Sequence, residues 1–167
     1  NHTPESYEQS RALAREALDI DPDYVDAWNM LSVVYSSLAG LGVLADEQGY
    51  PKAIETARKA LAIDPNSADA YAELAQVALT AEDDQQEAAR YLQKALTLEP
   101  NNTYALGGAS ILAKSLGRLD LAVRIQQQAV ERDPLMANAF SELCLALFQS
   151  GRVDESIVQC RKALELS

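Results

Sequence analysis

The segment Ala60-Leu61-Ala62-Ile63-Asp64-Pro65 recurs along this chain of 167 residues. Related copies ending in proline stand at residues 17–22, 95–100 and 129–134, and a fifth copy, at residues 163–166, stops before its proline. The prolines at 22, 65, 100 and 134 are therefore 43, 35 and 34 residues apart. A period between about 20 and 50 residues indicates an array of repeated supersecondary units.

Each copy is expected to end a helix, because proline lacks a backbone N–H and clashes with the turn before it. The chain is rich in Ala and Leu and only 6% aromatic, which favours helix over sheet. Polar residues at 23, 66–67 and 101–102 are expected to cap the helix that follows each turn. Helices that open a pair are expected at 25–39, 68–81, 103–116 and 137–150, and helices that close one at 6–21, 51–64, 86–99, 119–133 and 153–166.

Residue size follows a fixed order between the prolines. With each proline counted as position 32 of a 34-residue unit, large residues fall at position 4 and small ones at positions 8, 20 and 27. Position 4 is occupied by Trp28, Tyr71, Leu106 and Phe140, and position 8 by Ser32, Ala75, Ser110 and Cys144. Positions 20 and 27 are occupied by Ser10, Ala53, Ala88, Ala122 and Ser156, and by Ala17, Ala60, Ala95, Ala129 and Ala163. This order resembles the tetratricopeptide repeat family over nearly the whole chain.

The resemblance implies an all-α fold, a right-handed superhelix of stacked antiparallel helix pairs. We call the first helix of each pair helix A and the second helix B. The expected single array has an unpaired helix B at 6–22, followed by repeats at 25–65, 68–100, 103–134 and 137–167. Small residues at positions 8, 20 and 27 let the two helices approach closely, and neighbouring pairs stack because one pair cannot bury its apolar face alone.

The first full repeat departs from the family because it is about nine residues too long, with the surplus at 37–49. One interpretation is a longer helix A plus a loop that packs Leu38, Leu41 and Leu44 on a neighbour. The other is a projecting edge of the array that contacts a bound partner. Long connections of this kind loosely resemble those in tetratricopeptide tails of bacterial signalling and regulatory proteins.

Gly107-Gly108 lies inside an expected helix A, where each glycine costs about 1 kcal/mol relative to alanine. A packed helix that tolerates or bends at them is favoured over a close approach by a partner backbone. Cys144 and Cys160 fall on facing sides of one helix pair, near enough for a disulfide. Two small buried thiols packed as apolar groups are the favoured interpretation.

In this family the concave surface is lined by helices A, chiefly at positions 2, 5, 9 and 12. The resemblance therefore implies a groove that holds a protein or peptide. Its candidate residues are Asp26, Asn29, Val33, Asp69, Gln76, Leu79, Tyr104, Gly107, Ile111, Lys114, Asn138, Ser141, Leu145 and Phe148.

The best-known partner of such grooves is the acidic tail of a chaperone, which basic residues grip. Here only Asn29 fits that pattern, so a chaperone tail is not expected. An apolar stripe edged by Asp26, Asp69 and Glu73 instead predicts a partner that is apolar with some basic character, either an extended peptide or an amphipathic helix.

The charge balance excludes other partners. Acidic residues outnumber basic ones by 25 to 14, a net charge of −11, which disfavours nucleic acid and anionic membranes. No apolar stretch approaches the length of a membrane span, and two cysteines are too few for a disulfide scaffold, so a reducing cytoplasm is the expected location. His2 is the only histidine, so no catalytic residue, metal site or cofactor is expected and the protein is not predicted to be an enzyme.

The ends of the array suggest a second function. Leu13 in the first expected helix and Ile157, Leu164 and Leu166 in the last would lie partly bare, because solenoids normally close with a polar capping helix. Either the chain is part of a larger protein, or these ends associate in a homodimer.

Overall fold

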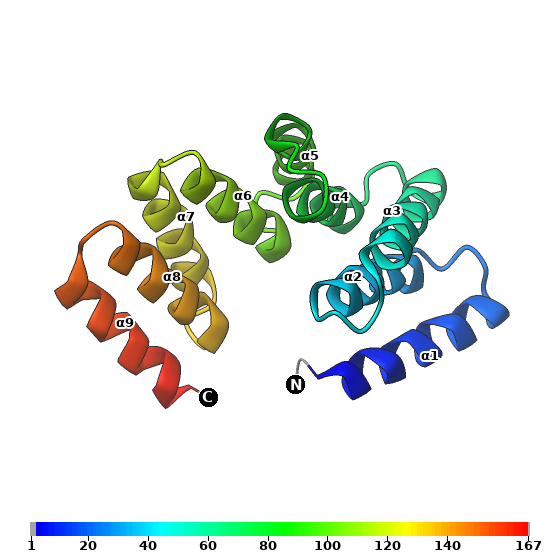
Figure 1. Ribbon diagram of the computed structural model, residues 1–167, viewed down its shortest axis with the longest axis horizontal. Coiled ribbons are helices and arrows are strands. Elements are labelled where there is room, and N and C mark those ends of the chain that lie inside the picture. Colours follow the sequence, from blue (N-terminus) through cyan, green and yellow to red (C-terminus); the bar gives the residue numbers. More distant parts are fainter. Residues whose placement is uncertain (1–2, 167) are drawn as a thin grey trace. The chain divides into compact units, whose positions relative to one another are not determined.

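The computed structural model describes residues 3–166, and over that range the regular elements are all α-helices (Figure 1). A leading helix is followed by four helix pairs, which confirms the all-α expectation. The helices are α1 (Pro4–Ile20), α2 (Val25–Gly40), α3 (Asp46–Ile63), α4 (Ala68–Thr80), α5 (Gln85–Leu98), α6 (Thr103–Ser115), α7 (Leu119–Arg132), α8 (Ala137–Gln149) and α9 (Val153–Glu165). The chain divides into two compact units, Asn1–Ala105 and Leu106–Ser167, which we call unit 1 and unit 2 and describe separately.

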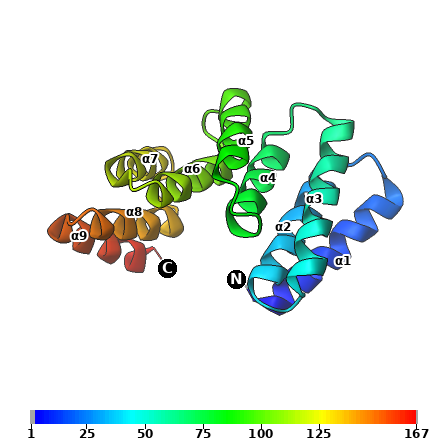
Figure 2. The ribbon, with the colours of Figure 1, turned by 45° about the horizontal axis from the view of Figure 1, so that its top comes forward.

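Helix bounds agree with the sequence expectation to within two residues, except at the start of α3. That helix begins at Asp46 and not at residue 51, so Pro51 lies inside it. Figure 2 shows α3 lying beside α2 within unit 1. Asp46 and Glu47 occupy the first turn, where carboxylates interact favourably with the unpaired N–H groups of a helix start. The extra residues of the first repeat are therefore shared between the end of α2, a short loop and the first turn of α3.

The residues of this longer connection pack unequally. Leu38 is fully buried and Leu44 packs against the core of unit 1, but Leu41 is 51% exposed. The expectation that all three leucines pack is therefore wrong for Leu41. At the other end of the connection, α3 approaches α2 so closely at Gly49 that a Cβ there would stand 2.5 Å from the Cβ of Ala39.

Small residues hold the two helices of a pair together, as the sequence predicts. Ser32 of α2 is fully buried and donates a hydrogen bond of 2.7 Å to the carbonyl oxygen of Ala53 of α3. In unit 2 the donor lies on the other helix: Ser156 of α9 donates to the carbonyl oxygen of Cys144 of α8, at 2.9 Å. Each buried serine hydroxyl thus has a hydrogen-bond acceptor on the neighbouring helix, so the polar group can be buried while the two helices stay in contact.

Two of the three predicted caps form. The Ser67 hydroxyl accepts the N–H of Ala70 at the start of α4, and the side chain of Asn102 accepts the N–H of Ala105 in α6. Asp23 does not cap α2, whose N-cap residue is Tyr24 and which has no side-chain cap. The Asp23 N–H is instead a donor to the Asp21 carboxylate, which rigidifies the turn before the helix.

Two linked apolar clusters lie in the core of unit 1. One joins α1, α2, α3 and α4, and the other joins α3 and α4; Trp28 and Ile54 pack against both. In unit 2, Ala113 of α6 packs with Ala122 and Val123 of α7 and with an apolar row on α8. Each unit therefore buries the apolar faces of several helices together.

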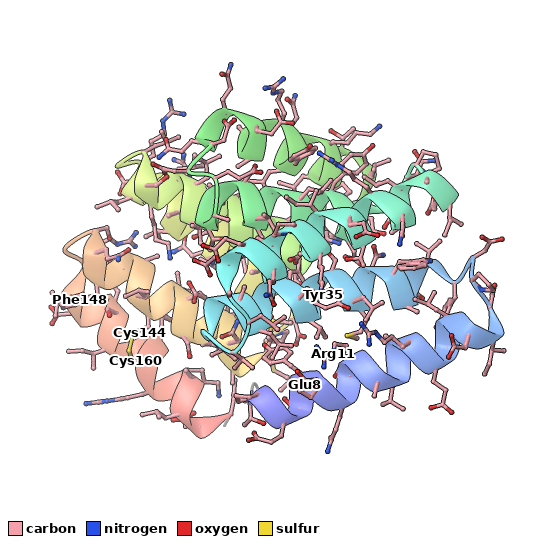
Figure 3. The ribbon with its side chains drawn as sticks, turned by 45° about the vertical axis from the view of Figure 1, so that its right-hand side comes forward. Glu8, Arg11, Tyr35, Cys144, Phe148 and Cys160 are labelled. Atoms are coloured by element: carbon pink, nitrogen blue, oxygen red, sulfur yellow. A yellow bond between two sulfur atoms is a disulfide. The ribbon has the colours of Figure 1, made fainter. Side chains whose placement is uncertain are left out.

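The cysteines of unit 2 correct a sequence expectation. Cys144 of α8 and Cys160 of α9 form a disulfide, with their Cα atoms 5.2 Å apart (Figure 3). Cys144 is buried, but Cys160 is exposed, so the expectation of two buried free thiols is wrong. The spacing had placed both residues on facing sides of the pair, and that Cα separation lies within the range a disulfide spans.

Candidate binding surface

Charge is segregated between the two kinds of helix in unit 1. Helices α2 and α4, the A helices, contain no Lys or Arg, and their charged residues are Asp26, Asp69 and Glu73. The basic residues up to Ala105 all lie on α1, α3 and α5: Arg11, Arg15, Lys52, Arg58, Lys59, Arg90 and Lys94. The charged residues of α2 and α4 are therefore all acidic.

Several of these basic side chains are engaged with residues of unit 1. Arg15 donates a hydrogen bond of 2.8 Å to the hydroxyl of Tyr35. Arg11 pairs with Glu8 on α1 (Figure 3). The Nζ of Lys59 lies 4.7 Å from the ring centroid of Trp28. This cation–π contact joins the ammonium of α3 to an aromatic ring of α2.

A pocket of about 300 Å³ opens on unit 1 where α2, α3 and α4 meet the first residues of α6. Its lining is mixed, with hydroxyls, two tyrosines, one carboxyl group and no basic side chain. The lining residues are Val33, Ser36, Ser37, Gly40, Tyr50, Glu73, Gln76, Thr80 and Tyr104. Three of the predicted groove residues, Val33, Gln76 and Tyr104, are therefore brought together here.

Glu73 is the residue of this pocket that the sequence placed wrongly. It was expected at the edge of the groove, but it is only 3% exposed. Its Oε1 has no hydrogen-bond partner among the described residues, and the Ser36 hydroxyl is the donor to its carboxyl group. Burial raises the pKa of Glu73, and the Ser36 hydrogen bond opposes that shift only in part. An acidic residue within the run Ala72-Glu73-Leu74-Ala75 was the signal available in the sequence.

Tyr104 lies at the exposed side of the same pocket, and the pKa of its hydroxyl is affected by the acidic groups there. The residue is 53% exposed, and its pKa is raised by partial burial first and then by the carboxylates of Glu73 and Asp69. Asp69 is itself held in place, because the side-chain amide of Asn102 donates to it at 2.6 Å. Two carboxyl groups therefore act on Tyr104 at this pocket, and no basic side chain lines it.

The remaining candidates of unit 1 lie outside this pocket. Asp26 is exposed and lines a second hollow, of about 270 Å³, between α1 and α2. Asn29 is half-buried, and its side-chain amide donates to the Ser67 hydroxyl at 3.0 Å. Leu79 is half-buried on α4. The one residue that matched the basic chaperone-tail pattern is therefore engaged inside the protein.

In unit 2 the candidates form a more apolar surface. Phe148 is 61% exposed, and Ile111 and Leu145 are exposed as well. Lys114 of α6 is half-buried and pairs with Glu142 of α8, with 3.4 Å between Nζ and Oε2. Asn138 and Ser141 are exposed at the start of α8, and a Cβ on Gly107 would meet no atom within 4 Å among the residues that the structure describes.

Other kinds of site are not found in the described part of the chain. Between residues 3 and 166 no three or more His, Cys, Asp or Glu side chains are grouped so that they could hold a metal ion. Over the same range no helix combines the length and the apolar character needed to cross a bilayer. His2, on which the argument against a catalytic set depends, lies outside the described residues.

Two sequence profiles of the tetratricopeptide repeat match residues 56–91 and 108–167, which together make up more than half of the chain. The chain belongs to the tetratricopeptide repeat family. Over 73 residues it is also 33% identical to the small glutamine-rich tetratricopeptide repeat-containing protein 2 of Mycosarcoma maydis. That match covers 44% of this chain and 21% of the relative, so the chain spans about a fifth of the relative's length.

Solved tetratricopeptide repeat structures share the fold. MamA is 25% identical, with a TM-score of 0.62, over 96% of this chain and 88% of MamA. PilW, described as a type IV pilus biogenesis factor, is 24% identical, with a TM-score of 0.71, over 98% and 72% of the two chains. YrrB, described as having an unusual peptide-binding site, is 24% identical, with a TM-score of 0.60, over 98% and 79%. The fold is therefore a solenoid of antiparallel helix pairs.

Proposed function

We propose that this tetratricopeptide repeat chain is a protein-interaction module that holds an apolar segment of basic character against its A helices. The observation that carries the proposal is the charge segregation of unit 1, where α2 and α4 contain acidic residues and no basic ones. The segment is either an extended peptide or one face of an amphipathic helix. The same fold carries a peptide-binding site in YrrB.

The apolar part of this recognition is assigned to exposed or half-buried side chains of the A helices. The side chains that would contact the apolar residues of the partner are Val33 of α2, Leu79 of α4 and, in unit 2, Ile111, Leu145 and Phe148. Asp26 and Asp69 supply the acidic part, and Gly107 allows close approach of the partner backbone. The polar contacts are assigned to Asn29, Gln76, Tyr104, Lys114, Asn138 and Ser141. An acidic chaperone tail is disfavoured, because α2 and α4 offer no cation to receive it.

Selection from a random peptide library tests this function. We expect selected peptides to combine apolar residues with Lys or Arg, and to bind less tightly as salt is raised. Asp26→Lys should weaken binding, because it places a cation on the acidic surface. Glu16→Lys is the matched control, since it makes the same charge change at an exposed site on α1. Selection of acidic peptides, or of none, would overturn the proposal.

Self-association is the second candidate. The hollow between α1 and α2 is lined by Leu13, which is 66% exposed, together with Tyr24 and Met30, which are also exposed. On α9, Leu164 is 78% exposed, and Ile157 and Val158 are exposed beside it. In this case α9 of a second copy would occupy the hollow. Light scattering at increasing protein concentration tests for self-association. A strict monomer would remove this candidate. If the mass does grow with concentration, Leu13→Glu should abolish the growth.

No catalytic role is proposed, and none of the recognition above requires a cofactor. We place the chain within a larger protein, in the cytoplasm. The Cys144–Cys160 disulfide is the observation that stands against this location, since disulfides persist mainly in oxidising compartments. Rapid alkylation of intact cells followed by mass spectrometry tests the location: two alkylated cysteines support it, and a protected pair contradicts it.

A further inference from the structure

The burial of Glu73 needs a physical reason. A carboxyl group that is 3% exposed, with Oε1 unpartnered among the described residues, has lost its water without a full set of replacements. The Ser36 hydroxyl, which lowers the pKa of this carboxyl group, also donates a hydrogen bond of 3.1 Å to the carbonyl oxygen of Val33. Because a hydroxyl carries a single hydrogen, Ser36 cannot fully satisfy both acceptors.

Unit 1 does not supply a counter-charge for this carboxyl group. No Lys or Arg lines the pocket, and the basic residues of the unit lie on α1, α3 and α5. The carboxylate of Asp69 adds negative charge nearby, since both Asp69 and Glu73 act on Tyr104. A buried carboxyl oxygen with no hydrogen-bond partner among the described residues, in a pocket that no basic side chain lines, is suited to a cation that arrives from outside.

We propose that the pocket at Glu73 receives the cationic side chain of a lysine or arginine of the bound partner, with Glu73 as its counter-charge. The proposal deepens the function proposed above and rests on it for the source of the side chain. It assigns to one residue of the partner the basic character that the acidic A helices favour, and it makes Glu73 a specificity-determining residue.

The other walls of the pocket suit such a side chain. Tyr50 and Tyr104 line it, and aromatic rings attract ammonium and guanidinium groups. Val33 offers apolar surface to the methylene stem that precedes the charge, and Gly40 has no side chain to obstruct it. A volume of about 300 Å³ accommodates one long side chain, so the pocket fits an anchoring residue and not a folded element.

A small cation tests the pocket without any peptide. Labelled protein is titrated with n-butylammonium chloride, with n-butanol and sodium chloride as controls, while the amide signals of Ser37, Gly40 and Tyr104 are followed by NMR. We expect saturable shifts with the ammonium ion only. Glu73→Gln should abolish them, and Glu47→Gln, the same change at an exposed site on α3, should leave them intact.

A second variant keeps the carboxylate and blocks the space. A Cβ on Gly40 would stand 3.8 Å from the Tyr50 hydroxyl, an ordinary contact, so Gly40→Leu should fold and place its side chain in the pocket. It should also abolish the shifts. Equal shifts with n-butanol and n-butylammonium, or shifts that persist in Glu73→Gln, would overturn the proposal.

Peptides then test the anchoring role. In a peptide selected from the random library, each Lys or Arg is replaced in turn by norleucine, which keeps the stem and removes the charge. One replacement should weaken binding to the wild-type protein by about 10- to 100-fold, the range expected for a hydrogen-bonded charge. The same replacement should have little effect on binding to Glu73→Gln, and exchange between Lys and Arg shows which cation fits better.

The two proposals fail in different ways. If selected peptides bind but no single cationic position couples to Glu73, the pocket assignment is wrong and the interaction function stands. If no peptide is selected, the interaction function fails, and the n-butylammonium titration still decides whether the pocket recognises cations.

Discussion

The indole Nε1 of Trp28 donates a hydrogen bond of 2.9 Å to the carbonyl oxygen of Pro22. Tyr71 makes the equivalent contact in the next repeat, where its hydroxyl donates to the carbonyl oxygen of Pro65 at 3.4 Å. Each bond joins position 4 of a helix A to the proline that ends the preceding helix B. The large residue and the proline of the repeat pattern therefore fix the turn between them as a unit.

Trp28→Phe should lower the free energy of unfolding by about 1–2 kcal/mol. The change removes the hydrogen bond to Pro22, worth about 1 kcal/mol, and weakens the cation–π contact with Lys59, worth about 0.5–1 kcal/mol. Urea unfolding followed by circular dichroism measures the loss. Tyr71→Phe is the matched control, and its effect should be smaller because its bond is longer. An equal or larger loss in Tyr71→Phe would contradict the importance given to the Trp28 bond.

Gly49→Ala should destabilise the protein by about 1–3 kcal/mol, the usual cost of overpacking a tight contact. The added Cβ would stand 2.5 Å from the Cβ of Ala39 and 3.1 Å from the carbonyl oxygen of Tyr35, so α2 and α3 would have to separate. Thermal unfolding of the variant measures this cost.

Gly107→Ala is the control for Gly49→Ala, because it makes the same change inside another helix. A Cβ there meets nothing within 4 Å among the described residues, so alanine should stabilise α6 by up to about 1 kcal/mol through its helix propensity. Loss of stability in both variants would show that the α2–α3 contact is not the cause.

The sequence was most informative where the physics is local. Proline ends a helix by its own chemistry, so a regular series of prolines placed the helix bounds closely. The sequence predicts a helix from residue 51, but α3 begins earlier, with the acidic residues at 46 and 47 in its first turn. A proline can lie inside a helix when the surrounding packing compensates for it.

The candidate site was harder to predict because it depends on packing between repeats. Positions along each A helix gave Val33, Gln76 and Tyr104, which do line one pocket. The burial of Glu73 depends on how α2 lies beside α4, and that follows from the tertiary structure and not from the order of residues in one repeat. Likewise, spacing brought Cys144 and Cys160 together, but it does not determine whether they are oxidised.

Reduction of the Cys144–Cys160 disulfide should destabilise the α8–α9 pair. The bond closes a loop of 16 residues in sequence, for which the unfolded-chain entropy model gives a stabilisation of about 3 kcal/mol. Hydrogen exchange measures the effect, since amides of α9 should exchange faster after treatment with a reductant. In Cys160→Ser, exchange should already be fast and unchanged by the reductant. Identical protection of α9 before and after reduction of the wild-type protein would contradict a stabilising role.

Glu73→Gln should raise stability at neutral pH and lose this advantage in acid. The folded protein holds the pKa of Glu73 above its ordinary value, because burial disfavours the charged form more than Ser36 supports it. Below the ordinary value the carboxyl group is protonated in both states and contributes nothing. Between the ordinary and the raised value only the folded state holds the proton, so the stability of the wild-type protein falls as pH rises through this window, and above it the loss is constant.

The measurement that checks this sign is the difference in unfolding free energy between wild type and Glu73→Gln, followed from acid to neutral pH. The difference should grow in favour of Glu73→Gln through the window and then level off. The groups that act with Glu73 at the pocket, Ser36, Asp69 and Tyr104, are present in both proteins. Glu47→Gln, at an exposed carboxylate, should show no such growth. A difference that shrinks as pH rises would mean that the folded protein stabilises the ionised carboxylate, and the pocket would then already contain the counter-charge that the partner is proposed to bring.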